Sequence, residues 1–134
     1  MRFLIVDDDP AIVMLVDNLI FKLGHEAVTC LDAAEVEAVQ GEVHGAIVDW
    51  HLGDVTSETV TLRLQEQFPG IPMMMITGAS DLNLIQTALK LGVNDWWYKP
   101  TGIPKLKRQL QHLITEAAQR RSQDTSSGDE NCAA

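Results

Sequence analysis

The chain is poor in the features that mark secreted, disulfide-bonded or membrane proteins. It contains two cysteines, Cys30 and Cys132, which are too few for a disulfide framework and follow no metal-binding spacing. No apolar stretch approaches the roughly 20 residues of a transmembrane helix. The first apolar run, residues 3–6, is too short for a signal peptide and has no small-residue cleavage site. These absences predict a cytoplasmic protein without a membrane-bound segment.

Positive charge is also scarce. The sequence has 10 Lys and Arg residues against 19 Asp and Glu residues, which gives a net charge of −9. Contacts to nucleic-acid phosphates need clustered Lys and Arg, so this balance argues against direct nucleic-acid binding and against an anionic membrane surface. The same excess of carboxylates is compatible with cation binding if several of them converge.

The chain does have enough apolar sequence for one core. It has 134 residues, of which 46% are hydrophobic, and a domain of this size buries about 68–70% of the surface that its unfolded chain exposes. The patterned part of the sequence ends near Arg121, and residues 122–134 are small and polar. We therefore expect one domain over residues 1–121 and a polar tail or linker over residues 122–134.

Apolar runs and helical periodicities alternate along this domain. Strands are predicted at residues 3–6, 27–31, 43–49, 71–77 and 93–98. A helix is predicted after each strand. The fourth helix should be capped by Ser80 or Asp81, and the fifth should span residues 103–121. The pattern of residues 58–68 fits a strand or a helix, and the alternation favours a helix. Four helices should end at glycines that can adopt a left-handed cap, namely Gly24, Gly41, Gly70 and Gly92. Five strand–helix units predict an α/β fold, a doubly wound parallel five-stranded sheet with helices on both faces.

Polar side chains stand where four of these strands end. Because all carboxyl ends of a parallel sheet meet at one edge, and ligands bind there in open α/β sheets, we expect the four groups to gather. One polar strand end alone has little meaning, whereas four at one edge indicate a site. The residues are Asp7 and Asp8, Asp49, Thr77, and Lys99.

These residue types favour phosphoryl transfer. Crowded carboxylates repel, and a hard cation such as Mg²⁺ relieves the repulsion while still binding phosphate oxygens. The Thr77 hydroxyl and the Lys99 ammonium suit the oxygens of a phosphoryl group. A carboxylate can itself accept a phosphoryl group and become an aspartyl phosphate. We therefore interpret Asp49 as the reactive group, assisted mainly by positioning and charge neutralisation.

The four strand ends also resemble the motifs of the receiver domain of two-component response regulators. The matching segments are VDDDP at 6–10, IVD at 47–49, ITG at 76–78 and YKP at 98–100. The resemblance implies a flavodoxin-like (βα)5 fold with strand order 2-1-3-4-5. It implies that Asp49 accepts a phosphoryl group from a histidine kinase or phosphotransfer protein, and that the domain then switches conformation to signal to a partner.

The resemblance also implies individual roles. Asp7, Asp8 and Asp49, together with the backbone carbonyl of His51, would bind Mg²⁺, while Thr77 and Lys99 would act on the phosphoryl group. Trp96 falls where the family has an aromatic residue that turns inward on activation, although Trp is larger than the usual Tyr or Phe. A homodimer through the face formed by the fourth helix, fifth strand and fifth helix is possible. No enzymatic activity is expected beyond self-phosphoryl transfer and autodephosphorylation.

Two alternatives remain open at the level of the sequence. A receiver-like interaction module that is not phosphorylated would explain the atypical Trp96, but it gives no reason for the intact acids, Thr77 and Lys99. A haloacid-dehalogenase-type phosphatase could use Asp7 and Asp9. It lacks the expected Gly-Thr after these acids and a late acidic pair, and it leaves Asp49 unexplained.

Overall fold

The computed structural model describes residues 1–50, 55–78, 82–93 and 95–133, and it contains one five-stranded sheet with helices on both faces. All neighbouring strands are parallel, and their order is β2-β1-β3-β4-β5, which confirms the predicted fold class. The elements are β1 Arg2–Val6, α1 Pro10–Lys22, β2 Glu26–Cys30, α2 Ala33–Glu37, β3 Gly45–Trp50, α3 Val55–Gln67, β4 Met73–Thr77, α4 Leu82–Lys90, β5 Asp95–Tyr98, the 3₁₀-helix η1 Lys99–Thr101, and α5 Ile103–Ala133.

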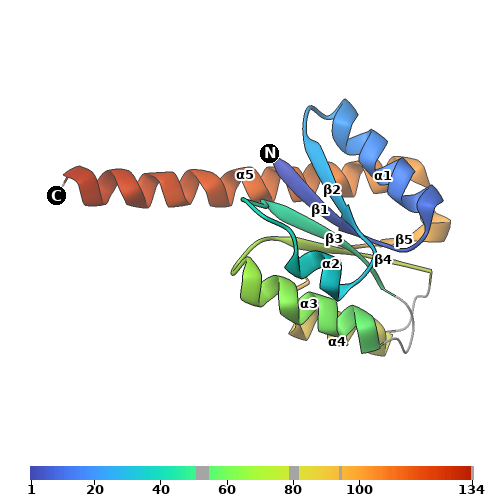
Figure 1. The fold of residues 1–134 in the computed structure, drawn as a ribbon. Coiled ribbons are helices and arrows are strands. Elements are labelled where there is room, and N and C mark those ends of the chain that lie inside the picture. The colour runs from blue at the N-terminus through green and yellow to red at the C-terminus, as the bar shows by residue number, and fades with distance from the viewer. Residues whose placement is uncertain (51–54, 79–81, 94, 134) are drawn as a thin grey trace.

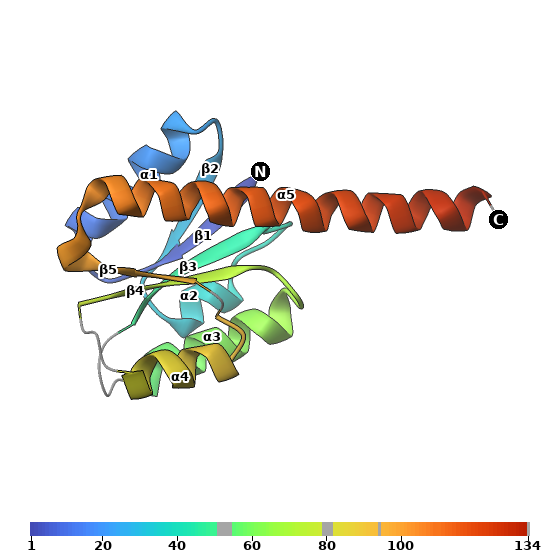
Figure 2. The same cartoon turned by 180° about the vertical axis from the view of Figure 1, so that it is seen from behind.

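The helices form two layers around the sheet. Helices α1 and α5 cover one face, and α2, α3 and α4 cover the other (Figures 1 and 2). Strands β3 and β4 are buried at every position because both of their faces are covered. Alternate residues of β1 illustrate the division: Phe3 and Ile5 pack toward α1 and α5, whereas Leu4 and Val6 pack toward the other layer.

Local sequence accounts for the ends of most elements. The Asp9 side chain accepts a hydrogen bond from the Ala11 amide at 3.0 Å and caps α1, whose first residue is Pro10. The four glycines that were predicted to end helices all have positive φ, and Gly24, Gly70 and Gly92 closely follow α1, α3 and α4. The prediction for Gly41 was wrong, because α2 already ends at Glu37. Gly45 serves a different purpose, because a Cβ atom there would lie 2.9 Å from the Phe3 ring on the adjacent strand. Glycine at this position therefore lets β1 and β3 approach closely.

Several predicted boundaries differ from the structure, most by one or two residues. Helix α3 begins at Val55 rather than at residue 58, and β3 extends to Trp50. Helix α5 continues past Arg121 to Ala133, because no proline interrupts residues 122–133 and the only glycine, Gly128, lowers helical stability without ending the helix. The division into a domain over 1–121 and a tail or linker over 122–134 stays a prediction. Among the described residues, none of the helices combines the length and apolar character needed to cross a bilayer.

The buried row of α5 should contribute strongly to stability. Leu110 is fully buried, so Leu110→Ala removes apolar contacts and leaves a cavity that should cost about 2–5 kcal/mol in the free energy of unfolding. The matched substitution Leu62→Ala, at an exposed position of α3, should change it by less than about 0.5 kcal/mol. Urea denaturation of both variants measures the difference, and equal losses would contradict the assigned packing of α5.

Candidate functional site

Three carboxylates gather at the carboxyl edge of the sheet, as the sequence predicts. Val6 of β1 pairs with Val48 of β3, so Asp7 and Asp49 follow adjacent buried positions on neighbouring strands. One carboxylate oxygen from each of Asp7, Asp8 and Asp49 lies within 4.8 Å of the others. Asp7 and Asp49 are buried, at 3% and 6% exposure, whereas Asp8 faces solvent. A ligand entering from solvent would therefore meet Asp8 first and the two buried acids beneath it.

Backbone interactions fix the position of Asp7. Its amide donates to the Cys30 carbonyl at 3.1 Å, which extends the pairing of β1 with β2 by one residue. One oxygen of its side chain, Oδ1, accepts from the Asp9 amide at 2.8 Å, and Asp9 in turn caps α1. The other oxygen, Oδ2, is buried and receives no hydrogen bond from any described residue. Asp7 therefore keeps one buried carboxylate oxygen that could bind a cation.

Asp49 is held by helix α3 as well as by its strand. The Ser57 hydroxyl donates to the Asp49 carbonyl at 3.1 Å, and the Thr61 hydroxyl donates to the Ser57 carbonyl at 2.8 Å. Both hydroxyl-bearing residues are buried. The sequence did not predict this support, because Ser57 lies just outside the helix predicted over residues 58–68. The signal was present, since Ser57, Thr61 and Leu64 lie on one helical face that also carries the buried Val60.

Lys99 supplies the positive charge of the cluster. Its ammonium nitrogen lies 3.7 Å from Oδ1 of Asp49, and its side chain is one third exposed. The turn that carries it is anchored on both sides: the Thr101 hydroxyl donates to the Tyr98 carbonyl at 2.7 Å, and the indole N–H of the buried Trp97 donates to the Gly102 carbonyl at 3.0 Å. These bonds hold the backbone on both sides of Lys99 at the carboxyl edge.

The remaining predicted residues take different places. Thr77 is buried and ends β4, paired with Trp50 and one position beyond Ile76, the β4 partner of Asp49. His51, predicted to offer its carbonyl to a metal, lies outside the described residues. Trp96 is half-buried against the cluster on the α2, α3 and α4 side, and its carbonyl accepts a hydrogen bond from the Gln109 side chain. Asp7, Asp8, Asp49 and Lys99 thus form the site, and Thr77 borders it on the next strand.

Burial and repulsion together raise the proton affinity of Asp7. The pKa of its carboxyl is raised from 3.8 to about 6; loss of solvent is the largest cause and the nearby Asp49 carboxylate adds to it, while the Asp9 amide and the Lys99 ammonium oppose the rise. A buried acid with a raised pKa beside two other carboxylates is a place where a divalent cation relieves an existing electrostatic cost. Oxygen donors of this kind suit Mg²⁺, which also retains waters or phosphate oxygens.

Comparison with known proteins finds the same family along most of the chain. A family model described as the response regulator receiver domain matches residues 3–111. The "Chemotaxis protein CheY1" of Helicobacter pylori is 29% identical over 120 residues, which cover 85% of this chain and 97% of that protein.

Solved structures share the fold. A CheY-like response regulator receiver domain protein from Methanospirillum hungatei superimposes with a TM-score of 0.76 at 25% identity, covering 89% of this chain and 97% of that one. The response regulator protein TrrA from Thermotoga maritima, described as a complex with Mg(2+)-BeF, has a TM-score of 0.69 at 19% identity and covers 84% of this chain and 97% of that one. At that identity, the second likeness concerns the fold alone.

The raised pKa of Asp7 predicts a pH-dependent stability. Between pH 3.8 and about 6, the Asp7 carboxyl is protonated in the folded state and ionised in the unfolded state. Its contribution to the free energy of unfolding is therefore fully present below pH 3.8 and is lost as the pH rises through about 6. The shift corresponds to roughly 3 kcal/mol. In chelator-treated protein, the stability of Asp7→Asn relative to wild type should therefore be about 2 kcal/mol higher at pH 7 than at pH 4.5, measured by urea denaturation.

The exposed Asp17 on α1 provides the matched control. Asp17→Asn removes one carboxylate far from the crowded edge, so its stability should follow that of wild type across the same pH range. Parallel pH profiles for wild type and Asp7→Asn would show that the Asp7 carboxyl titrates as an ordinary acid.

Proposed function

Because the chain belongs to the family of response regulator receiver domains, we propose that its carboxyl-edge site is a phosphoryl-accepting switch with Asp49 as the acceptor. The observation that carries this proposal is the contact between Lys99 and Asp49 inside a cluster with Asp7 and Asp8. The family takes part in two-component signalling, in which phosphorylation on Asp is general. The proposal assigns that chemistry to particular atoms of this chain.

The geometry around Asp49 supports its assignment as the acceptor. Its carboxylate lies 3.7 Å from the Lys99 ammonium, and its backbone is anchored by both β3 and Ser57. In the transfer, an oxygen of Asp49 forms a bond to phosphorus while the phosphorus–nitrogen bond of a donor phosphohistidine breaks, and the histidine keeps the electron pair. Because its backbone is anchored, the Asp49 carboxylate can receive the phosphoryl group only from a narrow range of directions. Positioning of this kind supplies most of the catalysis in phosphoryl transfer.

Asp7, Asp8 and Asp49 would hold Mg²⁺. The buried Oδ2 of Asp7 without a donor, the exposed carboxylate of Asp8 and the oxygens of Asp49 form an all-oxygen donor set of the type that this ion prefers. When bound, Mg²⁺ neutralises the charge on the transferred phosphoryl group. The Mg(2+)-BeF complex named for the TrrA protein supports this assignment by analogy of fold. The carbonyl of His51 stays a predicted further ligand.

Lys99 and Thr77 act on the product. The Lys99 ammonium already lies next to Asp49 and can follow the negative charge onto the phosphoryl oxygens. Thr77 is buried and is the last residue of β4, the strand next to β3. Its hydroxyl would bind the phosphoryl group, and this contact would draw the end of β4 toward Asp49. Since only the phosphorylated state offers these contacts, phosphorylation shifts the population toward a second conformation. Trp96 on β5 is the aromatic residue that this proposal places in the switch.

The remaining parts of the proposal concern partners. The family interacts with histidine kinases or phosphotransfer proteins, and such a protein would phosphorylate Asp49. A homodimer through α4, β5 and α5 is a possible readout, and direct binding of nucleic acid by this chain is not expected from its charge of −9. The protein acts as a signalling component rather than as an enzyme on other substrates. A cytoplasmic location and a domain boundary near Arg121 belong to the same proposal.

Phosphorylation at Asp49 is directly measurable. With Mg²⁺ and acetyl phosphate, wild type should gain the mass of one phosphoryl group in intact-protein mass spectrometry. Asp49→Asn should gain none, because the amide cannot replace the carboxylate nucleophile. Asp17→Asn, which changes an exposed acid of α1, should be labelled like wild type. Equal labelling of wild type and Asp49→Asn would contradict the acceptor, and no labelling of wild type would favour the alternative of a receiver-like module that is not phosphorylated.

Metal binding should appear as stabilisation. A ligand that binds only the folded state adds about 2.7 kcal/mol to the free energy of unfolding at a hundred times its Kd, so Mg²⁺ should raise the denaturation midpoint of wild type at pH 7. Asp8→Asn removes the exposed ligand without disturbing the buried pair, and it should lose most of this gain. A gain that survives in Asp8→Asn would place the ion elsewhere.

A further inference from the structure

Two buried hydroxyl groups of helix α3 differ in what they bind. Ser57 and Thr61 are both buried, and buried polar side chains as a rule form hydrogen bonds. The Thr61 hydroxyl donates to the Ser57 carbonyl, one turn earlier in the same helix, at 2.8 Å. The Ser57 hydroxyl instead donates to the Asp49 carbonyl, eight residues earlier in the chain, at 3.1 Å. Of the two groups, the Ser57 hydroxyl therefore joins the helix to the strand end that carries the reactive carboxylate.

Sheet pairing supports the backbone of Asp49 mainly from one side. Along β4, the pairing of β3 continues past Asp49 as far as Trp50. Along β1, the last paired residues are Val6 and Val48, one position before Asp49. The Asp49 carbonyl and the Trp50 amide belong to one planar peptide unit. A hydrogen bond from Ser57 to this carbonyl therefore restricts the ψ torsion of Asp49 independently of the strand pairing.

Helix α3 is itself held in place at its far end. The Gln65 side chain donates to the carbonyl of Leu91, in the connection between α4 and β5. The Gln67 side chain donates to the carbonyl of Val39, just after α2, at 3.1 Å. These bonds fix the helix against two other segments of the chain. Ser57 therefore binds Asp49 from a helix that is itself anchored.

We propose that Ser57 is a positioning residue for phosphoryl transfer, an inference that rests on the function proposed above. By binding the Asp49 carbonyl, Ser57 fixes the direction in which the Asp49 carboxylate leaves the backbone. It acts through that backbone and exchanges no proton with the phosphoryl group. Transfer depends on the alignment of the reacting atoms, and a misplacement of about 1 Å can cost about a hundredfold in rate.

The rate of phosphorylation by acetyl phosphate at saturating Mg²⁺ tests the proposal. Ser57→Ala removes the donor to the Asp49 carbonyl and should slow the reaction at least about fivefold. Thr61→Val is the matched control, because it removes the other buried hydroxyl of the same helix and leaves the bond to Asp49 intact. It should react within about twofold of the wild-type rate. An unchanged rate in Ser57→Ala, or equal slowing in both variants, would overturn the positioning role.

A second measurement separates positioning from general destabilisation. A hydrogen bond polarises the carbonyl group that accepts it, so the Asp49 carbonyl ¹³C resonance should move upfield in Ser57→Ala and stay in place in Thr61→Val. Slower labelling of Ser57→Ala without this shift would contradict the proposal. If Ser57→Ala does not fold, Ser57→Cys keeps a side chain of similar shape with a weaker donor. It should still react more slowly than Thr61→Val, and a wild-type rate would overturn the role of Ser57.

Failure of this inference differs from failure of the phosphoryl-accepting switch. If wild type gains no phosphoryl group under the same conditions, both the switch and the role of Ser57 are wrong. If wild type is labelled on Asp49 and Ser57→Ala is labelled equally fast, the switch stands and only the role of Ser57 is wrong.

Discussion

Mutual repulsion of two buried carboxylates is the constraint on which the structure depends. Asp7 and Asp49 are almost inaccessible and sit at the ends of adjacent strands. Two unit charges about 4 Å apart repel by about 4 kcal/mol at the effective dielectric of a protein surface. The chain relieves this cost only in part, through the Lys99 ammonium and through a raised pKa of Asp7. A cation that binds between these carboxylates therefore relieves a repulsion that the fold itself leaves in place.

The fold can keep these carboxylates close together because apolar packing in the rest of the sheet outweighs their repulsion. Strands β3 and β4 are buried along their whole length, and each acid follows a run of side chains packed between two helical layers. A one-residue slip of β3 would move every side chain of the strand to the other face of the sheet and take Asp49 away from Asp7, so the register of the strand fixes the site. Ser57 and Asp9 then fix the local backbone with single hydrogen bonds.

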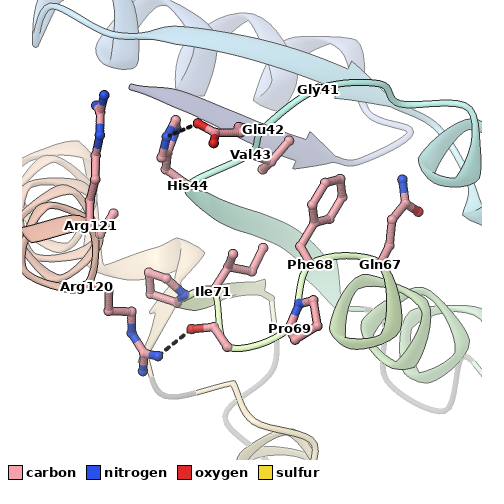
Figure 3. A pocket seen from close by; sticks show the side chains of 13 residues that line it. Gly41, Glu42, Val43, His44, Gln67, Phe68, Pro69, Ile71, Arg120 and Arg121 are labelled. Carbon is pink, nitrogen blue, oxygen red and sulfur yellow. Dashed lines mark hydrogen bonds and ion pairs between the residues drawn. The ribbon is translucent and has the colours of Figure 1, made fainter. Parts of the chain in front are cut away.

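The sequence predicts what depends on local pattern and misses what depends on distant contacts. Asp7, Asp49, Thr77 and Lys99 each end an apolar run, and the parallel arrangement alone brings such ends together, so the site could be inferred. The helical spacing of Ser57, Thr61 and Leu64 indicates that Ser57 belongs to a buried face, but it does not identify the acceptor, which is the Asp49 carbonyl on another element. The hydrogen bond from Arg120 of α5 to the Gly70 carbonyl (Figure 3) likewise joins two segments that no single periodicity relates.

Helix α5 connects the two edges of the sheet. It begins at Ile103, just after the turn that carries Lys99, and Arg120 lies about 25 Å further along the helix at 1.5 Å per residue (Figure 2). Its buried row of Leu106, Leu110, Leu113 and Ala117 holds it against the sheet along this distance. A displacement of the turn around Lys99 can therefore reach Arg120 only if the whole row shifts together, so coupling between the edges requires a second packing of α5 rather than a local adjustment.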